Sequence, residues 1–194
     1  MTVFQYIELF AMVTGIAYAV LEILQKNAMW VVGLLTASAC AFSFAVQHVW
    51  ASMGLNLYYL VMSVVGLVQW RKAGAQVGEG EIHLAVLPQK VVFLSIFLLV
   101  VGIGVMTPVL KAAGGAYAPL DAVAVTISVI ATWWLAQSYL QQWFLWVVAD
   151  LFTTTLCLLT GQYWMAALYL CYIGSAVYGY FHWKRHGKYL TLPE

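Results

Sequence analysis

Long apolar runs separated by short polar breaks dominate the pattern of the chain. Seven runs are apolar over the roughly 20 residues that a helix needs to cross a bilayer, and they span about 4–24, 29–47, 53–70, 90–110, 119–138, 142–160 and 163–183. The breaks at 25–27, 139–142 and 161–162 are so short that neighbouring helices must run antiparallel. The pattern therefore predicts an all-α membrane protein with seven transmembrane helices.

Composition excludes two broad classes of protein. Only 8% of the 194 residues are charged and 64% are hydrophobic, whereas soluble domains carry roughly 25% charged residues. A soluble fold is therefore excluded, and the lipid bilayer is the expected surrounding. The net charge of +1 provides no basic face for a phosphate backbone, so nucleic acid is not an expected partner.

The distribution of cations predicts the orientation, because Lys and Arg are retained on the cytoplasmic side. With the N-terminus outside and the C-terminus in the cytoplasm, only Lys111 falls outside, and the cytoplasmic segments hold Lys26, Arg71, Lys72, Lys90, Lys184, Arg185 and Lys188. Five tryptophans near helix ends are expected at the headgroup level, where amphipathic rings gather: Trp30, Trp50, Trp70, Trp164 and Trp183.

An internal repeat appears when the chain is compared with itself at an offset of 113 residues. The matching pairs are Trp30 with Trp143, Tyr59 with Tyr172, Gly66 with Gly179, and Trp70 with Trp183. Helices one to three then match helices five to seven, and the fourth helix lets both halves enter the membrane from the same side. Such a 3+1+3 parallel pseudo-repeat is a transporter device, with the substrate between the halves. The alternative is that such residues recur in any helical membrane protein.

The repeat gives an expected division of the chain into five parts. These are the first three-helix repeat (1–72), a cytoplasmic linker (73–89), a connector helix (90–110), the second three-helix repeat (119–185) and a cytoplasmic tail (186–194).

Asp150 is the strongest candidate for a functional residue, because ionisable groups inside the hydrocarbon are costly and its own span contains no cation. Helical periodicity places it on one face with Trp143, Trp146, Thr153 or Thr154, and Cys157. Two indoles beside one carboxylate suit a flat, cationic, heteroaromatic ligand. The alternative is a structural acid that bonds to hydroxyl groups of neighbouring helices.

Other polar residues in the apolar runs are weaker candidates for substrate binding. Asn56 and Gln137 could orient a ligand through their amides, Tyr59 and Tyr172 could face each other as repeat mates, and Glu22 could line the site. For each residue the alternative is interhelical packing or, for Glu22, a local ion pair with Lys26.

The sequence predicts no catalytic residue, metal site or cofactor. It contains no P-loop, GxGxxG after a strand, HExxH, GxSxG or paired CxxC motif. The three cysteines are expected to be core thiols, and the histidines fall at predicted helix ends or in loops.

The whole chain resembles the PnuC-like vitamin transporters, also called the nicotinamide mononucleotide transporter family. The resemblance rests on GLNLYYLVMSVVGLVQW at 54–70, WFLWVVAD at 143–150 and LYLCYIGSAVYGYFHWKR at 168–185. The family's WxxWxxx[N/D] substrate motif falls on Trp143, Trp146 and Asp150, and its polar position in the third helix falls on Asn56.

This resemblance implies a SWEET-like bundle, a homotrimer and a place in the bacterial inner membrane. It also implies facilitated diffusion of an unphosphorylated vitamin, which a cytoplasmic vitamin kinase or pyrophosphokinase then traps. Thiamine is the favoured substrate because Asp150, Asn56 and Glu22 resemble the thiamine (PnuT) branch. Nicotinamide riboside is the alternative, with riboflavin behind both.

Two rival classes would bind the same kind of ligand without moving it. A membrane sensor should carry an output domain, yet only 11 residues follow Trp183. A membrane-bound enzyme should carry an acid–base pair or a metal set at depth, yet Asp150 has no evident titratable partner in the sequence.

Overall fold

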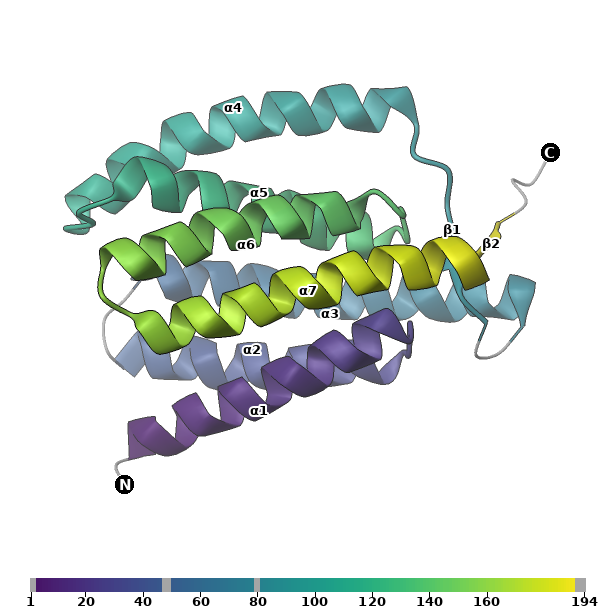
Figure 1. The fold of residues 1–194 in the computed structure, drawn as a ribbon, viewed down its shortest axis with the longest axis horizontal. Coiled ribbons are helices and arrows are strands. Elements are labelled where there is room, and N and C mark those ends of the chain that lie inside the picture. Colours follow the sequence, from purple (N-terminus) through teal and green to yellow (C-terminus); the bar gives the residue numbers. More distant parts are fainter. Residues whose placement is uncertain (1–2, 47–49, 79–80, 191–194) are drawn as a thin grey trace. The chain divides into compact units, whose positions relative to one another are not determined.

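The computed structural model describes residues 3–46, 50–78 and 81–190, without the side chains of residues 3–12, 44, 50–52 and 164. Its helices are α1 (Val3–Ile23), α2 (Ala28–Val46), α3 (Trp50–Val77), α4 (Gln89–Ala112), α5 (Ala118–Ala136), α6 (Gln142–Leu159) and α7 (Tyr163–His186) (Figure 1). Two short strands, β1 (His83–Leu84) and β2 (Lys188–Tyr189), pair with each other. The prediction of seven helices is confirmed, whereas the strand pair was not predicted.

Four helical segments of the described chain are long and apolar enough to cross a membrane: Met53–Val77, Gln89–Ala112, Ala118–Ala136 and Gln142–Leu159. The tyrosines of α7 lower its mean hydropathy below that of these segments. Helix α4 exposes the large apolar side chains of Phe93, Phe97 and Val100, which suit a hydrocarbon environment. The chain is a multi-pass membrane protein.

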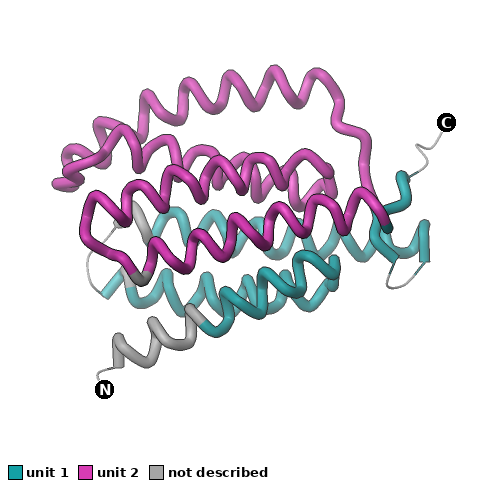
Figure 2. The backbone as a smooth tube through the Cα atoms, in the orientation of Figure 1, with its two compact units in different colours: residues 1–83, 186–194 teal, residues 84–185 magenta. Residues whose placement is uncertain are grey.

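The chain forms two compact units (Figure 2). Unit 1 is Met1–His83 with His186–Glu194, and unit 2 is Leu84–Arg185. In unit 1, α2 packs against α1 and α3, and in unit 2, α5 packs against α4 and α6. Helix α3 continues to Val77, beyond the expected end of the first repeat at 72, and the connector helix α4 belongs to unit 2. The five-part division itself stays a prediction.

A tryptophan pair lies at the core of each unit. In unit 1, Trp30 and Trp70 meet edge to face with ring centroids 5.1 Å apart. In unit 2, Trp143 and Trp183 do the same at 5.3 Å. Each pair uses a glycine of the longer helix: a Cβ added to Gly66 would lie 2.3 Å from the Trp30 ring, and one added to Gly179 would lie 2.4 Å from the Trp143 ring.

These pairs correct the expectation that the tryptophans near helix ends lie at the headgroup level. Trp30, Trp70 and Trp183 are almost fully buried, because each packs its ring against another indole inside its own unit. The side chains of Trp50 and Trp164 lie outside the described residues.

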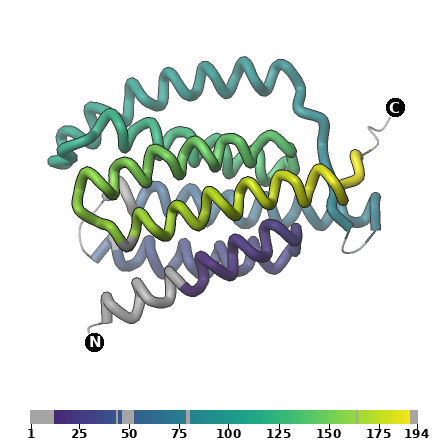
Figure 3. Tube along the Cα trace, viewed as in Figure 1, coloured from purple at the N-terminus to yellow at the C-terminus, as the bar shows by residue number. Residues whose placement is uncertain are grey.

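Helices α1 and α5 end in the same hydrogen-bonding motif. Gln25 and Ser138 adopt left-handed conformations, with φ of 47° and 60°. In each turn the left-handed residue donates to the carbonyl three residues earlier, and the next residue donates to the carbonyl five residues earlier, as in a Schellman cap. Glycine usually fills this position, as Gly114 does after α4 and Gly161 does after α6. The two exceptions are separated by the same 113 residues as the tryptophan pairs (Figure 3).

Helices α4 and α5 are held together by close packing and one side-chain hydrogen bond. The indole of Trp134 donates to the hydroxyl of Ser95 at 3.0 Å, and a Cβ added to Gly102 would lie 2.5 Å from the Thr126 methyl group. The connector helix is therefore a tightly packed member of unit 2.

Candidate functional site

One face of α6 carries buried polar atoms with no hydrogen-bond partner among the described residues. The face follows from helical geometry, since Trp143, Trp146, Asp150 and Thr154 recur at three- and four-residue spacings. The indole nitrogens of Trp143 and Trp146 and the hydroxyl oxygen of Thr154 are buried without a partner. By contrast, the neighbouring Thr153 hydroxyl donates to the Ala149 carbonyl at 2.9 Å. This face is therefore short of polar partners in a way that ordinary helix packing does not explain.

Asp150 lies at the centre of this face and is only 7% exposed. No described residue makes a hydrogen bond or an ion pair with its carboxyl group. A buried carboxylate with no protein partner is costly, so the alternative of a structural acid bonded to neighbouring hydroxyls lacks its bonds in this structure. The site is short of one positive charge.

Two tyrosines of α7 lie within electrostatic range of Asp150. The charge of Asp150 acts on the phenols of both Tyr169 and Tyr172. The two rings meet edge to face with centroids 5.8 Å apart, because a spacing of three residues puts them on adjacent positions of one helix face. Asp150, Tyr169 and Tyr172 thus form one cluster within unit 2.

Sequence reasoning missed Tyr169, although two signals for it were present. It stands three residues before Tyr172, and it is the offset-113 mate of the candidate Asn56. The missed signal was thus the pairing of an amide with a phenol, which an identity-based comparison of the two halves overlooks.

The two tryptophans of the α6 face have different surroundings. Trp143 is 3% exposed, and its ring is covered by Trp183 and Gly179. Trp146 is half-buried and has no aromatic ring contact among those described. The structure therefore gives Trp143 a packing contact and leaves the Trp146 ring available to a ligand. The predicted stacking role of both residues stays a prediction.

Unit 1 contains a second polar cluster, which holds two of the predicted residues. Tyr18 interacts electrostatically with Glu22 and Tyr59, and Glu22 is buried. Asn56 is half-buried on α3, one turn before Tyr59. The structure thus brings Glu22 and Tyr59 together through Tyr18, a residue that the sequence analysis did not single out.

The two units carry their polar residues on different helices. At the offset of 113 residues, Gly33 and Ala37 of α2 correspond to Trp146 and Asp150 of α6. A Cβ added to Gly33 would lie 3.1 Å from the Tyr18 ring, so in unit 1 a phenol from α1 occupies this space. Similar cores therefore support different chemistry in the two units.

The remaining predicted residue is not part of either cluster. Gln137 is half-buried at the end of α5. In the described part of the chain, no group of three His, Cys, Asp or Glu residues could hold a metal ion.

Comparison with known proteins places this arrangement in a family. The family model described as nicotinamide mononucleotide transporter matches residues 5–185. A protein of Neisseria mucosa named nicotinamide riboside transporter PnuC is 30% identical, over 91% of this chain and 72% of the relative. Proteins of the same name from Haemophilus influenzae and Escherichia coli are 27% and 22% identical, over 76% and 84% of their lengths and 89% and 92% of this chain.

A solved structure is similar over almost the whole chain. The crystal structure described as the vitamin B3 transporter PnuC is 28% identical and aligns with a TM-score of 0.71. The alignment covers 94% of this chain and 83% of the solved one. The matched region includes all seven helices and both polar clusters.

Proposed function

The chain belongs to the nicotinamide mononucleotide transporter family, and on this premise we propose that it carries nicotinamide riboside across the membrane. Membership of this family makes the chain a vitamin transporter, and the family is not an enzyme class. The relatives named above are nicotinamide riboside transporters. They lend no support to thiamine, which the sequence analysis favoured, and they fit its alternative better.

The observation that carries the proposal is the buried carboxyl group of Asp150, which has no bonding partner among the described residues. Nicotinamide riboside contains a flat pyridinium ring with a fixed positive charge. This cation would compensate the Asp150 carboxylate and stack on the neighbouring Trp146 indole, where a cation–π contact contributes about 0.5–2 kcal/mol.

The polar atoms around Asp150 match the rest of this substrate. Its carboxamide and ribose hydroxyl groups need donors and acceptors, which the Trp146 indole, the Thr154 hydroxyl and the tyrosines of α7 provide. In this proposal Trp143 supports the site from behind by packing on Trp183. Asn56, Tyr59, Glu22 and Gln137 are proposed to act in orienting the substrate, as the sequence analysis expected.

We propose the 3+1+3 parallel repeat as the mechanical basis of transport. Three kinds of correspondence at one offset support it: the edge-to-face tryptophan pairs, the glycines against them and the left-handed residues Gln25 and Ser138. In parallel-repeat transporters one half rocks against the other around a fixed site. Transport would be facilitated diffusion, with phosphorylation by a cytoplasmic kinase making uptake directional.

The setting of the protein is also a proposal. The excess of Lys and Arg in one set of loops supports an N-terminus outside and a C-terminus in the cytoplasm of a bacterial inner membrane. The homotrimer and the SWEET-like fold rest on the family resemblance alone.

Uptake into liposomes that contain the purified protein tests the proposal. We expect radiolabelled nicotinamide riboside to equilibrate without ATP or an ion gradient, and excess unlabelled nicotinamide riboside to compete with it. Thiamine and riboflavin serve as the other competitors. Competition by thiamine alone would restore the earlier choice of substrate, and binding without uptake would favour a sensor.

A further inference from the structure

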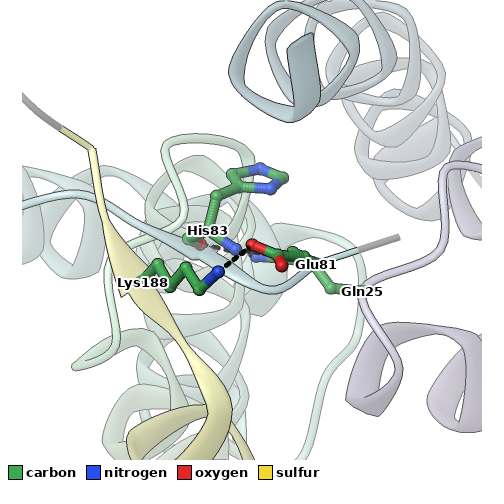
Figure 4. Close-up of polar contacts among 4 residues, drawn as sticks. All are labelled: Gln25, Glu81, His83 and Lys188. Atoms are coloured by element: carbon green, nitrogen blue, oxygen red, sulfur yellow. Dashed lines mark hydrogen bonds and ion pairs between the residues drawn. The ribbon is translucent and has the colours of Figure 1, made fainter. Parts of the chain in front are cut away.

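The segment Glu81–Ala85 is bonded to the α1–α2 turn of unit 1. The side-chain amide of Gln25 donates to the His83 carbonyl at 2.9 Å and accepts from the His83 N–H at 2.7 Å (Figure 4). Gln25 therefore takes the place of a neighbouring strand for this one residue. Its side chain is buried, so water does not readily replace these bonds. This role accounts for a glutamine at a left-handed position that glycine usually fills.

Two residues later, the same segment is bonded to the α5–α6 turn of unit 2. The Ala85 N–H donates to the Ser138 carbonyl at 3.1 Å, and Ala85 forms a parallel bridge with Tyr139. Ser138 is the left-handed residue that corresponds to Gln25 at the offset of 113 residues. The segment is thus attached to equivalent turns, one in each unit.

The boundary between the units runs through this segment. Unit 1 ends at His83 and unit 2 begins at Leu84, and the chain returns to unit 1 at His186. The returning tail pairs with the segment, since β2 pairs with β1 and the Lys188 N–H donates to the Ile82 carbonyl at 2.8 Å. Both covalent crossings between the units therefore meet in one short ladder.

We propose that residues Glu81–Ala85 are the hinge strand of this transporter, anchored by His83 to unit 1 and by Ala85 to unit 2, with Leu84 as the pivot. The proposal rests on the proposed function, because it assigns the motion that transport requires. Rocking of two bodies concentrates backbone rotation in the few residues that join them. Leu84 is the residue between the two anchors, and its buried side chain keeps the strand in place while its backbone rotates.

The ion pair at this strand is not the anchor. Lys188 and Glu81 lie in contact, but their side chains are 61% and 41% exposed, and exposed ion pairs contribute little. Figure 4 shows the His83 imidazole pointing away from this pair. The buried amide of Gln25 is therefore the group whose removal tests the hinge.

The test compares equilibrium binding of nicotinamide riboside with its initial rate of uptake into liposomes. For Gln25→Ala we expect a dissociation constant within about twofold of the unaltered protein and an uptake rate lower by at least about fivefold. Gln25→Asn keeps an amide and suits the left-handed backbone, but it is one methylene too short to span both bonds, so we expect the same result from it. Gln162→Ala is the matched control, because this exposed glutamine also follows a left-handed residue but bonds only to Thr160.

An unchanged uptake rate in folded Gln25 variants would overturn the hinge, as would an equal loss of binding and uptake. Hydrogen exchange of the unaltered protein provides a measurement that needs no variant. Saturation with nicotinamide riboside should change the exchange of amides in residues 81–87, and no change there would overturn the hinge. If the unaltered protein neither binds nor carries nicotinamide riboside, the proposed function fails before the hinge is compared.

Discussion

Trp143 packs edge to face against Trp183, with ring centroids 5.3 Å apart and ring planes at 85°. The equivalent contact in unit 1 joins Trp30 and Trp70, at 5.1 Å and 77°. Trp30 has no acidic residue one or two turns along its helix, since Gly33 and Ala37 stand where Trp146 and Asp150 stand in unit 2. The tryptophan pair is therefore a scaffold feature, and the ligand chemistry of α6 begins at Trp146.

Substitution of the two α6 tryptophans should separate folding from binding. We expect Trp146→Ala to weaken binding of nicotinamide riboside by about tenfold, the loss of one cation–π contact, with little change in melting temperature. Trp143→Ala removes a buried ring and should destabilise the protein by about 3–5 kcal/mol. Thermal unfolding in detergent and calorimetric binding measure both effects. A stable Trp143→Ala protein that has lost binding would contradict this assignment.

The contact between Gly179 and the Trp143 ring predicts a second difference in stability. A Cβ at Gly179 would lie 2.4 Å from the Trp143 ring, whereas one at Gly174 on the same helix would meet open space. Gly179→Ala should therefore lower the melting temperature by several degrees. Gly174→Ala should leave it unchanged or raise it, because alanine favours a helix by about 1 kcal/mol over glycine. Equal melting temperatures for the two variants would show that the rings do not pack in this way.

The phenol of Tyr169 is expected to contribute to binding through its hydroxyl group. Tyr169→Phe keeps the ring and its contact with Tyr172, so the fold should persist while affinity falls by about three- to tenfold, as for one hydrogen bond. Tyr178→Phe is the control, because Tyr178 is exposed and stacks on His182. The two dissociation constants, measured side by side, decide the point; a wild-type value for Tyr169→Phe would remove this residue from the site.

His83 predicts a dependence of stability on pH. Burial lowers the pKa of His83 from its ordinary value of 6.5 to about 4, and only a backbone contact with Glu81 opposes this shift. The unfolded chain then binds a proton that the folded chain does not, so the stability that neutral His83 provides is complete above pH 6.5 and is lost as pH falls through 6.5 toward 4. At pH 5 the loss is on the order of 2 kcal/mol.

Melting temperatures at pH 7.5 and pH 5 test this prediction. The unaltered protein should lose several degrees between the two values, and His83→Gln should lose less. His186→Gln provides the control, because His186 is exposed and its substitution should leave the pH dependence of the unaltered protein in place. A His83→Gln variant that loses as much stability as the unaltered protein would contradict the assignment.

The helices could be predicted from the sequence because apolar runs of membrane length are a strong local signal. The motif at Trp143, Trp146 and Asp150 was also visible, since three residues at helical spacing define a face without any knowledge of the partner helices. The tryptophan placement failed for the opposite reason. An indole near a helix end suits the headgroup region and a buried ring pair equally well, and only the opposing Gly66 or Gly179 decides between them.

The strand pair and its anchors could not be predicted, because they depend on residues far apart in the chain. Gln25 and His83 are separated by 58 residues, and a lone glutamine in a polar break carries no sign of its partner. Tyr18 and Tyr169 were missed for the same reason, since a tyrosine in an apolar helix becomes a candidate only when an acid is found beside it.

The most direct test of the account is the affinity of Asp150→Asn for nicotinamide riboside, measured by calorimetry on purified protein. The change keeps the shape of the side chain and removes only its charge. A buried charge pair loses at least about 2 kcal/mol when one partner is removed, so we expect the dissociation constant to rise by at least about 30-fold while the melting temperature stays the same or rises. An affinity equal to that of the unaltered protein would contradict the claim that Asp150 compensates the positive charge of the substrate.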